Sequence, residues 1–348
     1  MWAVRWHGRG DVRHETVPDA PAPGPREVRI AVAWCGLCGS DVLEYREGPF
    51  QVPVGAEHPV TGRRAPIVLG HEVSGRVRDV GAEVRAEARD IAEGALVALN
   101  ALIPCGTCRE CRSDAEHLCP DFGHIGMSAD GGLAQYVTVP AAMVVPAPPG
   151  LDAETAALAE PFAVAWHLVR RVGSPRGRAC LVVGSGSIGL AAALILRAGG
   201  NEVAVADVSK ERLAPARTLG LAAFAEGGPG VDVVLECSGA AAGFALACRA
   251  ARPGGTVGLA GLPGAPVPFD VSAAAHRELT LTGSMSHRAE ADLRPALDFL
   301  AAHAPAARAL ITGRVDLAAA VTGGLDVLAG PARGRHTKIL VRAGGDAA

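Results

Sequence analysis

The stretch RACLVVGSGSIGLAAALILRAGG, from Arg178 to Gly200, decides the fold of the second half of this 348-residue chain. An apolar run typical of a strand leads into a glycine-rich turn, and an Ala/Leu-rich run typical of a helix follows. Gly184, Gly186 and Gly189 give the turn the spacing G-x-G-x-x-G. The first glycine permits a tight turn, the second lets a pyrophosphate approach the backbone, and the third lets helix and strand pack closely. The helix N-terminus offers free N–H groups to phosphates. The stretch therefore predicts a dinucleotide-binding unit.

The next strand, NEVAVAD, ends at Asp207, 18 residues after Gly189. A carboxylate at this point accepts hydrogen bonds from the adenosine ribose and repels a 2′-phosphate, which favours NAD over NADP. Lys210 and Arg212 lie nearby and would weaken that preference. The alternative is a glycine-rich turn followed by a chance Asp. The candidate cofactor-binding residues are Gly184, Gly186, Ser187, Ile188, Gly189 and Asp207.

Further strands and helices alternate after this unit. The runs VDVVLECSG, GTVGLAGL and ELTLTGS are typical of strands, and each ends in small residues. Strands that alternate with helices indicate a parallel sheet with right-handed crossovers. After Met285 we expect two helical stretches, EADLRPALDFLAAH and DLAAAVTGGLDVLAG, and a last strand, HTKILVRA.

The first 150 residues have a different pattern. Short Val/Ile/Ala runs alternate with Pro and Gly, as in PREVRIAVAWCG and HEVSGRVRDVG, and indicate a small barrel-like β domain. The segment VVPAPPG, Val144 to Gly150, is predicted to be a linker or turn. Asp152 is a plausible N-cap for the helical stretch that follows.

Four cysteines lie close together in ALIPCGTCRECRSDAEHLCP, residues 101–120, with the spacing C-x2-C-x2-C-x7-C. Four thiolates in one loop suit a tetrahedral Zn²⁺, and a site with four protein ligands has no open position, so this zinc would be structural. Disulfides and an iron–sulfur cluster are the alternatives. A bacterial ferredoxin pattern has x3 before its last Cys, where this loop has x7. The candidate ligands are Cys105, Cys108, Cys111 and Cys119.

A second group of candidate ligands is dispersed along the chain. Cys38 lies in CGLCGSD, His71 in LGHEVSG and Glu160 in LAEPFAVAWH. One Cys, one His and one Glu leave a fourth position open for water or substrate, as in catalytic zinc sites. Glu72, next to His71, is a candidate supporting residue or alternate ligand. Alternatively, Cys38 and His71 are ordinary structural residues.

Composition limits the class of protein. With 49% hydrophobic and 20% charged residues, the chain has the balance of a soluble globular protein. A net charge of -3 argues against a nucleic-acid partner, and thus against a zinc-ribbon nucleic-acid binder. We find no signal peptide and no uncharged apolar run that could span a bilayer. The nine Cys therefore indicate metal binding in a reducing cytoplasm.

The order of these motifs, from CGLCGSD and LGHEVSG through the four-Cys lobe to G-x-G-x-x-G, resembles the zinc-dependent medium-chain dehydrogenase/reductase superfamily. The run CGLCGSDVLEYREGPF is most similar to the 2,3-butanediol dehydrogenase branch, with sorbitol dehydrogenases as near relatives. The resemblance implies an α/β protein with two domains. A GroES-like β-barrel catalytic domain would span 1–150 and 288–348, with its zinc lobe at 101–120. A Rossmann domain with a doubly wound parallel sheet would span 151–287.

The resemblance also implies roles for single residues. Cys38, His71 and Glu160 would bind a catalytic zinc, and the four lobe cysteines a structural one. Ser40 would hydrogen-bond the substrate hydroxyl, and Asp41 and Glu72 would support the ligands. NAD would be the second cofactor. Relatives are commonly homodimers or homotetramers that pair through the edge of the Rossmann sheet, here ELTLTGS.

We therefore expect an NAD-dependent, zinc-dependent oxidoreductase that converts a secondary alcohol, vicinal diol or polyol reversibly to a ketone. A dehydrogenase of a cyclic polyol, a sugar or a specialised metabolite is the alternative within enzymes. A zinc- and NAD-binding protein without turnover is the alternative of another class. Leu43 favours the latter, because relatives usually carry a proton-relaying His there, in GSDxHEY, and this chain reads GSDVLEY.

Overall fold

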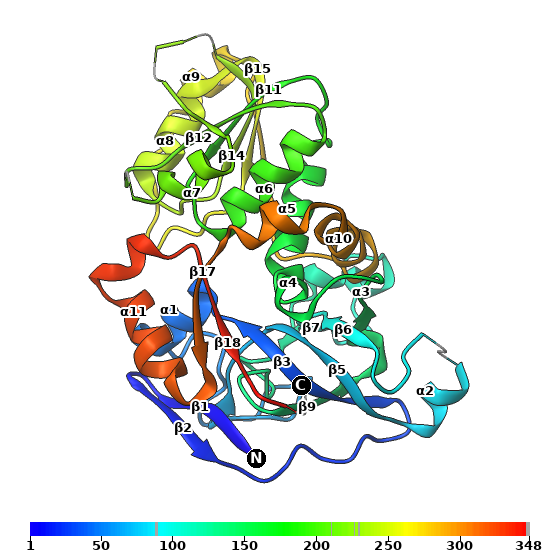
Figure 1. Ribbon diagram of the computed structural model, residues 1–348. Helices are drawn as coiled ribbons and strands as arrows, with labels where there is room; N and C mark the ends of the chain where they lie inside the picture. The colour runs from blue at the N-terminus through cyan, green and yellow to red at the C-terminus, as the bar shows by residue number, and fades with distance from the viewer. Residues whose placement is uncertain (88–89, 210, 226, 229, 346–348) are drawn as a thin grey trace. The chain divides into compact units, whose positions relative to one another are not determined.

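The computed structural model describes residues 1–87, 90–209, 211–225, 227–228 and 230–345, and it divides into two compact units (Figure 1). Unit 1 comprises 1–160, 288–304 and 311–348. Unit 2 comprises 161–287 and 305–310. Within the described residues, no helix is both long and apolar enough to cross a membrane.

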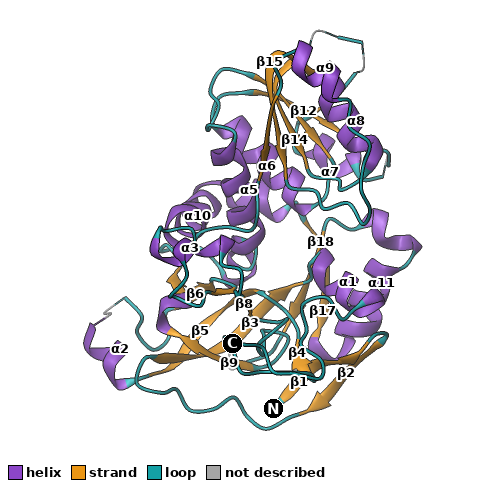
Figure 2. Ribbon diagram, turned by 180° about the vertical axis from the view of Figure 1, so that it is seen from behind, coloured by secondary structure: helices purple, strands orange, loops and turns teal. Residues whose placement is uncertain are grey.

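Unit 1 is built mainly from antiparallel strands, as the alternation of β-type runs and turns predicts (Figure 2). Its largest sheet has the order β10-β6-β5-β3-β18-β17, and β9 also pairs with β3. Val28, Ile30 and Val32 of β3 are fully buried in the hydrophobic core of this unit. The strands of this sheet are β3 (Glu27–Gly36), β5 (Glu72–Val80), β6 (Leu96–Leu99), β9 (Tyr136–Pro140), β10 (Val144–Pro146), β17 (Ile311–Asp316) and β18 (Lys338–Arg342).

Two small sheets complete the β structure of unit 1. One has the order β2-β1-β4, and the other pairs β7 with β8. Trp6 of β1 is buried, and its indole Nε1 donates a hydrogen bond to the Glu44 carbonyl at 3.0 Å. The strands are β1 (Trp2–Gly8), β2 (Asp11–Thr16), β4 (Ile67–Val68), β7 (Leu102–Ile103) and β8 (Gly123–His124).

The helices near the N-terminal side of the chain are short. They are α1 (Gly39–Glu47), α2 (Ala82–Glu87), α3 (Arg109–Arg112), η1 (Glu116–Leu118), η2 (Ala141–Met143) and α4 (Ala153–Ala156). Asp152 caps α4, since its Oδ1 accepts a hydrogen bond from the Thr155 N–H at 2.9 Å. The predicted helical stretch after Asp152 is split, and α5 (Ala159–Arg171) begins separately. Pro161 explains the split, because its ring has no N–H and would clash with the carbonyl of residue 157.

Two expectations for irregular segments were wrong. Val144–Pro146, predicted to belong to a linker or turn, is strand β10 and pairs with β6. The stretch DLAAAVTGGLDVLAG, predicted to be one helix, is divided into η4 (Leu317–Ala319), η5 (Ala320–Leu325) and α11 (Asp326–Ala329), followed by η6 (Pro331–Arg335). Gly323 and Gly324 account for the break, since glycine disfavours a helix interior by about 1 kcal/mol.

The other predicted C-terminal helix is present and kinked. It consists of η3 (Ala289–Leu293) and α10 (Arg294–Arg308). Inside α10, His303 leaves helical geometry with φ -126° and ψ 26°, two residues before Pro305. A proline within a helix removes one backbone hydrogen bond and bends the axis, which explains the kink.

Unit 2 contains a parallel six-stranded sheet with the order β13-β12-β11-β14-β15-β16. The chain first winds outward from β11 to β12 and β13, and then from β14 to β15 and β16. The strand order therefore reverses between β11 and β14. The strands are β11 (Ala179–Val183), β12 (Glu202–Ala206), β13 (Ala222–Ala223), β14 (Val231–Glu236), β15 (Ala251–Leu259) and β16 (Thr280–Gly283). The helices beyond α5 are α6 (Ser187–Ala198), α7 (Leu213–Thr218), α8 (Ala241–Ala250) and α9 (Val271–His276).

Candidate functional site

The glycine-rich turn joins β11 to α6, where the strand order of unit 2 reverses. Gly184 has φ +99°, and a Cβ there would lie 2.8 Å from the Ser238 nitrogen. A Cβ at Gly189 would lie 1.9 Å from the Gly184 carbonyl oxygen, so α6 can approach the turn only with glycine there. Gly186 differs, because nothing lies within 4 Å of its Cβ position. Its backbone is open to a bulky group at the point where α6 begins, and this arrangement fits a pyrophosphate.

Asp207 lies at the end of β12 and is bonded to the same turn. One carboxylate oxygen accepts hydrogen bonds from the backbone N–H and the hydroxyl of Ser185, both at 2.9 Å. The other accepts a hydrogen bond from the Ser209 N–H at 2.9 Å. Ser185 was not among the predicted cofactor-binding residues, although it lies between Gly184 and Gly186 in the glycine motif. Lys210, considered as a residue that weakens the NAD preference, lies outside the described residues.

In unit 1, a cluster of candidate ligands forms where β3 and β5 pair. Gly36 lies opposite Glu72 in the antiparallel register, so the chain segments that carry Cys38 and His71 meet. The ligand atoms of Cys38, His71 and Glu72 lie within 4.8 Å of one another. Cys38 is also the N-cap residue of α1, and its backbone N–H donates to Asp41 at 2.8 Å. The structure thus brings together two dispersed residues that the sequence analysis proposed as ligands.

The two ring nitrogens of His71 face different groups. Nε2 lies 3.4 Å from the Ser40 hydroxyl, and Nδ1 lies 3.5 Å from the Asp41 carboxylate. Burial tends to lower the pKa of His71. The negative charge of Asp41, hydrogen bonding to Asp41 and the neighbouring Cys38 outweigh burial and raise this pKa well above its usual value. A histidine whose ligand atom lies within 4.8 Å of a thiol sulfur and whose Nδ1 faces a carboxylate has the arrangement of a zinc ligand with its supporting group. This donor set fits Zn²⁺.

Glu72 forms a buried ion pair with Lys338 of β18. Both side chains are 1% exposed, and the lysine Nζ lies 2.5 Å and 2.7 Å from the two carboxylate oxygens. Nζ also donates to the Leu37 carbonyl at 3.0 Å. Burial works to lower the pKa of Lys338, but the negative charges of Glu72 and Cys38 raise it overall. Lys338 was not among the predicted site residues, although a lysine at the start of the apolar strand KILVR is an unusual signal.

Glu160 is also buried in unit 1. Burial raises its pKa to about 7, and the positive charge of His71 partly opposes that effect. Glu72, Lys338 and Asp41 also influence its pKa, so Glu160 lies in the same electrostatic environment as the cluster. It is not among the three residues whose ligand atoms lie within 4.8 Å of one another. Its role as a zinc ligand therefore stays a prediction.

The four cysteines of the loop between β7 and β8 converge as their spacing predicts. Their sulfur atoms lie within 4.8 Å of one another, and no disulfide joins them. The Cys108 and Cys111 sulfurs are 3.3 Å apart, and those of Cys105 and Cys111 are 3.9 Å apart. Sulfurs on a tetrahedral Zn²⁺ at 2.3 Å would be about 3.8 Å apart. The backbone N–H and hydroxyl of Thr107 lower the pKa of Cys105 to about 6, which favours a thiolate. The lobe fits zinc.

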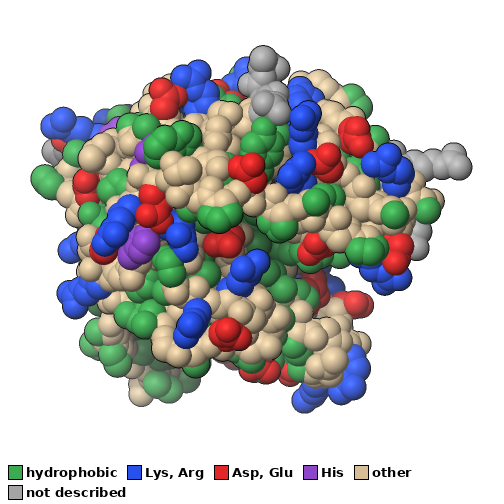
Figure 3. Space-filling view, turned by 90° about the horizontal axis from the view of Figure 1, so that it is seen from below, with side chains coloured by type: hydrophobic (Ala, Val, Ile, Leu, Met, Phe, Trp, Pro, Cys, Tyr) green, Lys and Arg blue, Asp and Glu red, His purple; other side chains and the backbone are tan. Residues whose placement is uncertain are grey.

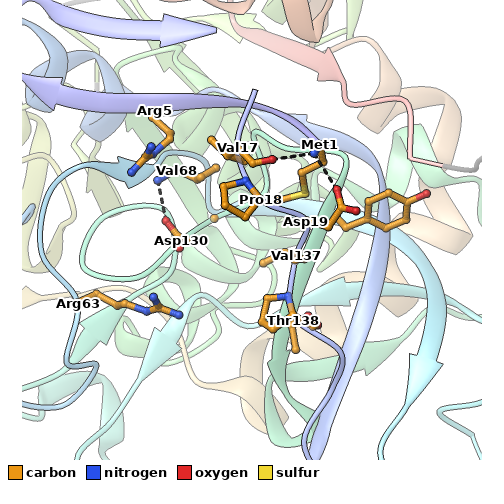
Figure 4. A pocket seen from close by; sticks show the side chains of 14 residues that line it. Met1, Arg5, Val17, Pro18, Asp19, Arg63, Val68, Asp130, Val137 and Thr138 are labelled. Carbon is orange, nitrogen blue, oxygen red and sulfur yellow. Dashed lines mark hydrogen bonds and ion pairs between the residues drawn. The ribbon is translucent and has the colours of Figure 1, made fainter. Parts of the chain in front are cut away.

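A separate cavity of about 290 Å³ lies in unit 1 beside the N-terminal residue (Figure 4). The Met1 amino group donates to the Val17 carbonyl at 2.8 Å and to Asp19 at 2.7 Å. On another part of its wall, Asp130 accepts a hydrogen bond from the Val68 N–H at 2.9 Å. Neither Cys38 nor His71 lines this cavity, so it is distinct from the ligand cluster.

A metal-ligand cluster and a dinucleotide-binding turn in one chain define a dinucleotide-dependent metalloenzyme. Residues 24–149 match the model of the alcohol dehydrogenase GroES-like domain, and residues 187–302 match that of the zinc-binding dehydrogenase. The chain is 33% identical over 304 residues to (R,R)-butanediol dehydrogenase of Neisseria gonorrhoeae, covering 82% of this chain and 84% of the relative. It is 33% identical over 295 residues to sorbitol dehydrogenase of Macaca fascicularis, covering 80% and 79%.

Solved structures agree with these relatives. The 2R,3R-butanediol dehydrogenase of Bacillus subtilis has a TM-score of 0.89 at 29% identity and covers 98% of this chain and 99% of that chain. A protein of Sinorhizobium meliloti, described as a zinc-binding dehydrogenase and bound to NADP, has a TM-score of 0.85 at 30% identity, with 98% of both chains covered. The chain belongs to the family of NAD-dependent zinc alcohol and polyol dehydrogenases. The predicted resemblance, the α/β fold class with GroES-like and Rossmann domains, and the cofactors zinc and NAD are confirmed.

Proposed function

We propose that this enzyme oxidises a vicinal diol or another secondary alcohol to a ketone, reversibly, with NAD as hydride acceptor. The cluster of Cys38 and His71 carries the proposal, because it places one thiol and one imidazole close enough together to bind the same zinc ion. The relatives named butanediol dehydrogenase and sorbitol dehydrogenase support a diol or polyol substrate.

We assign the catalytic zinc to Cys38, His71 and Glu160, and the structural zinc to the four lobe cysteines. A zinc ion held by the first set supplies a Lewis acid that lowers the pKa of a substrate hydroxyl. Lys338 engages both oxygens of Glu72, which supports a role for Glu72 behind the ligands. Asp41, through His71 Nδ1, fixes the orientation of the ring.

Ser40 handles the substrate proton. Its hydroxyl lies 3.4 Å from His71 Nε2, so a substrate hydroxyl that binds beside His71 would be within its reach. Ser40 accepts the hydrogen bond of the substrate hydroxyl and passes its proton onward. Leu43, on the same helix, is 45% exposed and cannot carry a proton. We therefore infer that water receives the proton from Ser40.

The NAD molecule would be held by Gly184, Gly186, Ser187, Ile188, Gly189 and Asp207, and it supplies the hydride acceptor. The open backbone at Gly186 supports this assignment. The Asp207 carboxylate disfavours a 2′-phosphate, so we propose that NAD is preferred over NADP.

A substrate panel tests the activity. The enzyme is mixed with NAD and vicinal diols, acyclic polyols, cyclic polyols or sugar acids, and NADH formation is followed by absorbance. We expect the highest kcat/KM with a vicinal diol, and Cys38→Ser should abolish turnover. The Escherichia coli L-galactonate-5-dehydrogenase, 37% identical over 194 residues, favours the sugar-acid arm as the second candidate. A wild-type enzyme that forms no NADH with any member of the panel would contradict the proposal.

Metal content tests the ligand assignment. Zinc per chain is measured by elemental analysis in Glu160→Gln and in its matched control Glu72→Gln. We expect two zinc ions in the wild type and one in Glu160→Gln. Glu72→Gln should keep both zinc ions at excess metal, with an affinity about 10-fold to 100-fold weaker at one of them. Loss of one zinc from Glu72→Gln, with both retained in Glu160→Gln, would assign the third ligand to Glu72 instead.

We also propose the domain roles, location and assembly. We propose a catalytic domain of 1–150 and 288–348, which contains Cys38, His71 and the four lobe cysteines, and an NAD-binding domain of 151–287, which contains the glycine-rich turn and Asp207. Glu160 lies within the second range, although it is the last residue of the first stretch of unit 1. The nine free cysteines support a location of the protein in a reducing cytoplasm.

We propose a homodimer or homotetramer that pairs at β16, because β16 ends the sheet and Leu262, Val271 and Met285 are exposed. Light scattering of wild type and Val271→Asp tests this assembly: a wild-type monomer would contradict it.

A further inference from the structure

Glu236, the last residue of β14, lies beside the glycine-rich turn and has no part in the chemistry described above. In the parallel register it lies opposite Val183, the residue before Gly184. The next residue, Cys237, donates its N–H to the Val183 carbonyl at 2.8 Å. Glu236 therefore stands at the carboxyl ends of the two strands between which the sheet order reverses. Dinucleotides bind at this point in doubly wound folds.

Glu236 accepts hydrogen bonds from the loop after β14 and from the loop after β15, through its carboxylate and its backbone carbonyl. Its carbonyl accepts hydrogen bonds from the N–H groups of Ala260 and Gly261, both at 2.9 Å. One carboxylate oxygen accepts from the N–H of Ser238 at 2.9 Å and from the Ser238 hydroxyl, and the other accepts from the Gly239 N–H at 3.4 Å. The ends of β14 and β15 are thus fixed through one residue.

The carboxylate is buried and is not neutralised by a cation. Glu236 is 3% exposed, and no Lys, Arg or His in the described ranges forms an ion pair with it. A Cβ at Gly261 would lie 2.3 Å from one of its carboxylate oxygens, and a Cβ at Gly243 would lie 2.9 Å from the other. Glycines at both positions leave space for the charged group. A buried charge without a cation is costly, and among the described residues it is stabilised only by the hydrogen bonds that it accepts from Ser238 and Gly239.

The position of this charge along the dinucleotide follows from the sheet order. Asp207, the residue after β12, lies on the half of the sheet that takes the adenosine ribose in such folds, and the pyrophosphate would lie at the N-terminus of α6. The other half of the dinucleotide must therefore extend toward β14 and β15, where Glu236 lies. The nicotinamide ring of NAD⁺ carries a positive charge, and that of NADH carries none. We propose that Glu236 is a positioning residue whose buried negative charge favours the oxidised over the reduced cofactor.

This inference rests on the assigned NAD site, and the equilibrium binding of both cofactors tests it. Dissociation constants for NADH are measured by fluorescence titration and those for NAD⁺ by competition, in wild type and Glu236→Gln. We expect the ratio of the NAD⁺ constant to the NADH constant to rise about threefold in Glu236→Gln, the effect of one charge at about 10 Å in a partly aqueous medium. An unchanged ratio, with or without a common loss of affinity, would overturn the proposal.

Two control variants separate charge from loop geometry. Ser238→Ala removes a hydroxyl bond and keeps the charge, so both affinities should fall together and the ratio should stay constant. Asp232→Asn removes one negative charge at the opposite end of the same strand, and its ratio should also match the wild type. A ratio that rises equally in Asp232→Asn would show a general charge effect and overturn the proposal.

If Glu236→Gln does not fold, Glu236→Ala removes the charge in its place and should raise the ratio to the same extent, and Glu236→Asp is a third control. Aspartate retains the negative charge with a shorter side chain, so the ratio should remain within about twofold of wild type even if both affinities fall. A ratio that changes beyond that range in Glu236→Asp would contradict a charge-based role. A wild-type protein that binds neither cofactor would refute the NAD site itself, which is a different result from a constant ratio.

Discussion

At the scale of single residues, Lys338 forms a buried ion pair in the ligand cluster of unit 1. It is buried at 2% exposure and neutralises Glu72, the neighbour of His71. The two residues are 266 positions apart in the sequence. Spacing within a short motif could identify Cys38 and His71 as candidates, but no local pattern connects a lysine near the end of the chain to them. Partners at such a separation become visible only when β18 pairs with β3.

We predict that Lys338→Met lowers the free energy of unfolding of unit 1 by about 3–5 kcal/mol, because Glu72 remains buried without its cation. Urea unfolding measures the effect. The double variant Lys338→Met/Glu72→Gln should recover part of the loss, because no buried charge is left.

Arg342→Met is the matched control on the same strand. Arg342 pairs with Asp316 at 2.7 Å, but both side chains are more than 60% exposed, at 63% and 65%. We expect a loss of at most about 1 kcal/mol. A loss in Lys338→Met no larger than that of Arg342→Met would show that the buried pair contributes little.

At the scale of elements, the turn between β11 and α6 shows that three glycines in one motif have different tasks. Gly184 adopts a positive φ, Gly189 allows close packing, and Gly186 leaves its surroundings open. The element and its glycines could be predicted from the sequence because the strand, turn and helix are contiguous. Segments whose residues favour both a turn and a strand were harder to predict. Val144–Pro146 contains proline and was predicted as a turn, but pairing with β6 made it a strand.

We predict opposite effects for two alanine substitutions in this turn. Gly186→Ala should leave stability within about 0.5 kcal/mol of wild type, since its methyl group points into open space, and should weaken NAD⁺ binding at least about tenfold by obstructing the pyrophosphate. Gly189→Ala should destabilise unit 2 by about 1–3 kcal/mol through overpacking against Gly184. Calorimetry and titration with NAD⁺ measure the two effects, and equal stabilities of the two variants would contradict the assignment.

Strand β14 also gives a pH-dependent prediction. Asp232, at its start, accepts hydrogen bonds from Arg252 at 2.8 Å and from the Ala179 N–H at 3.0 Å. The hydrogen bond from Arg252, then that from Ala179, lowers its pKa below the unperturbed 3.8. A lowered folded-state pKa stabilises the fold above pH 3.8, and this contribution disappears as pH falls through the folded-state pKa.

Asp232→Asn should therefore cost about 1 kcal/mol at pH 7 and less as the pH falls below 3.8. Urea unfolding of both proteins at pH 7 and at pH 3 measures the difference. Glu202→Gln, on the exposed start of β12, is the control and should show no such trend. A difference that grows on acidification would contradict the sign of the predicted effect.

At the scale of the whole molecule, the candidate sites are divided between the two units. Cys38, His71, Glu160 and the cysteine lobe belong to unit 1, and the glycine-rich turn and Asp207 belong to unit 2. Charged side chains of both signs are interspersed on the face that Figure 3 shows. Because the residues proposed to bind zinc and those proposed to bind NAD belong to different units, each cofactor should stabilise a different part of the chain.

We predict that chelation of zinc lowers the unfolding temperature of unit 1, and that NAD⁺ at about 100 times its dissociation constant stabilises unit 2 by about 2.7 kcal/mol. Tryptophan fluorescence can distinguish the units. Trp2, Trp6 and Trp34 lie in unit 1, and Trp166 lies in unit 2. In Trp166→Phe the remaining signal reports unit 1 alone. Stabilisation of that signal by NAD⁺ to the same extent as unit 2 would show that the units unfold together.

The cysteine lobe has a consequence for protein engineering. Its loop begins and ends at the short ladder of β7 and β8, in which Ile103 lies opposite Gly123. The ladder therefore holds the two ends of the loop next to each other. A foreign peptide or a second binding module could therefore be inserted between β7 and β8 in place of the lobe, because the two attachment points are already paired.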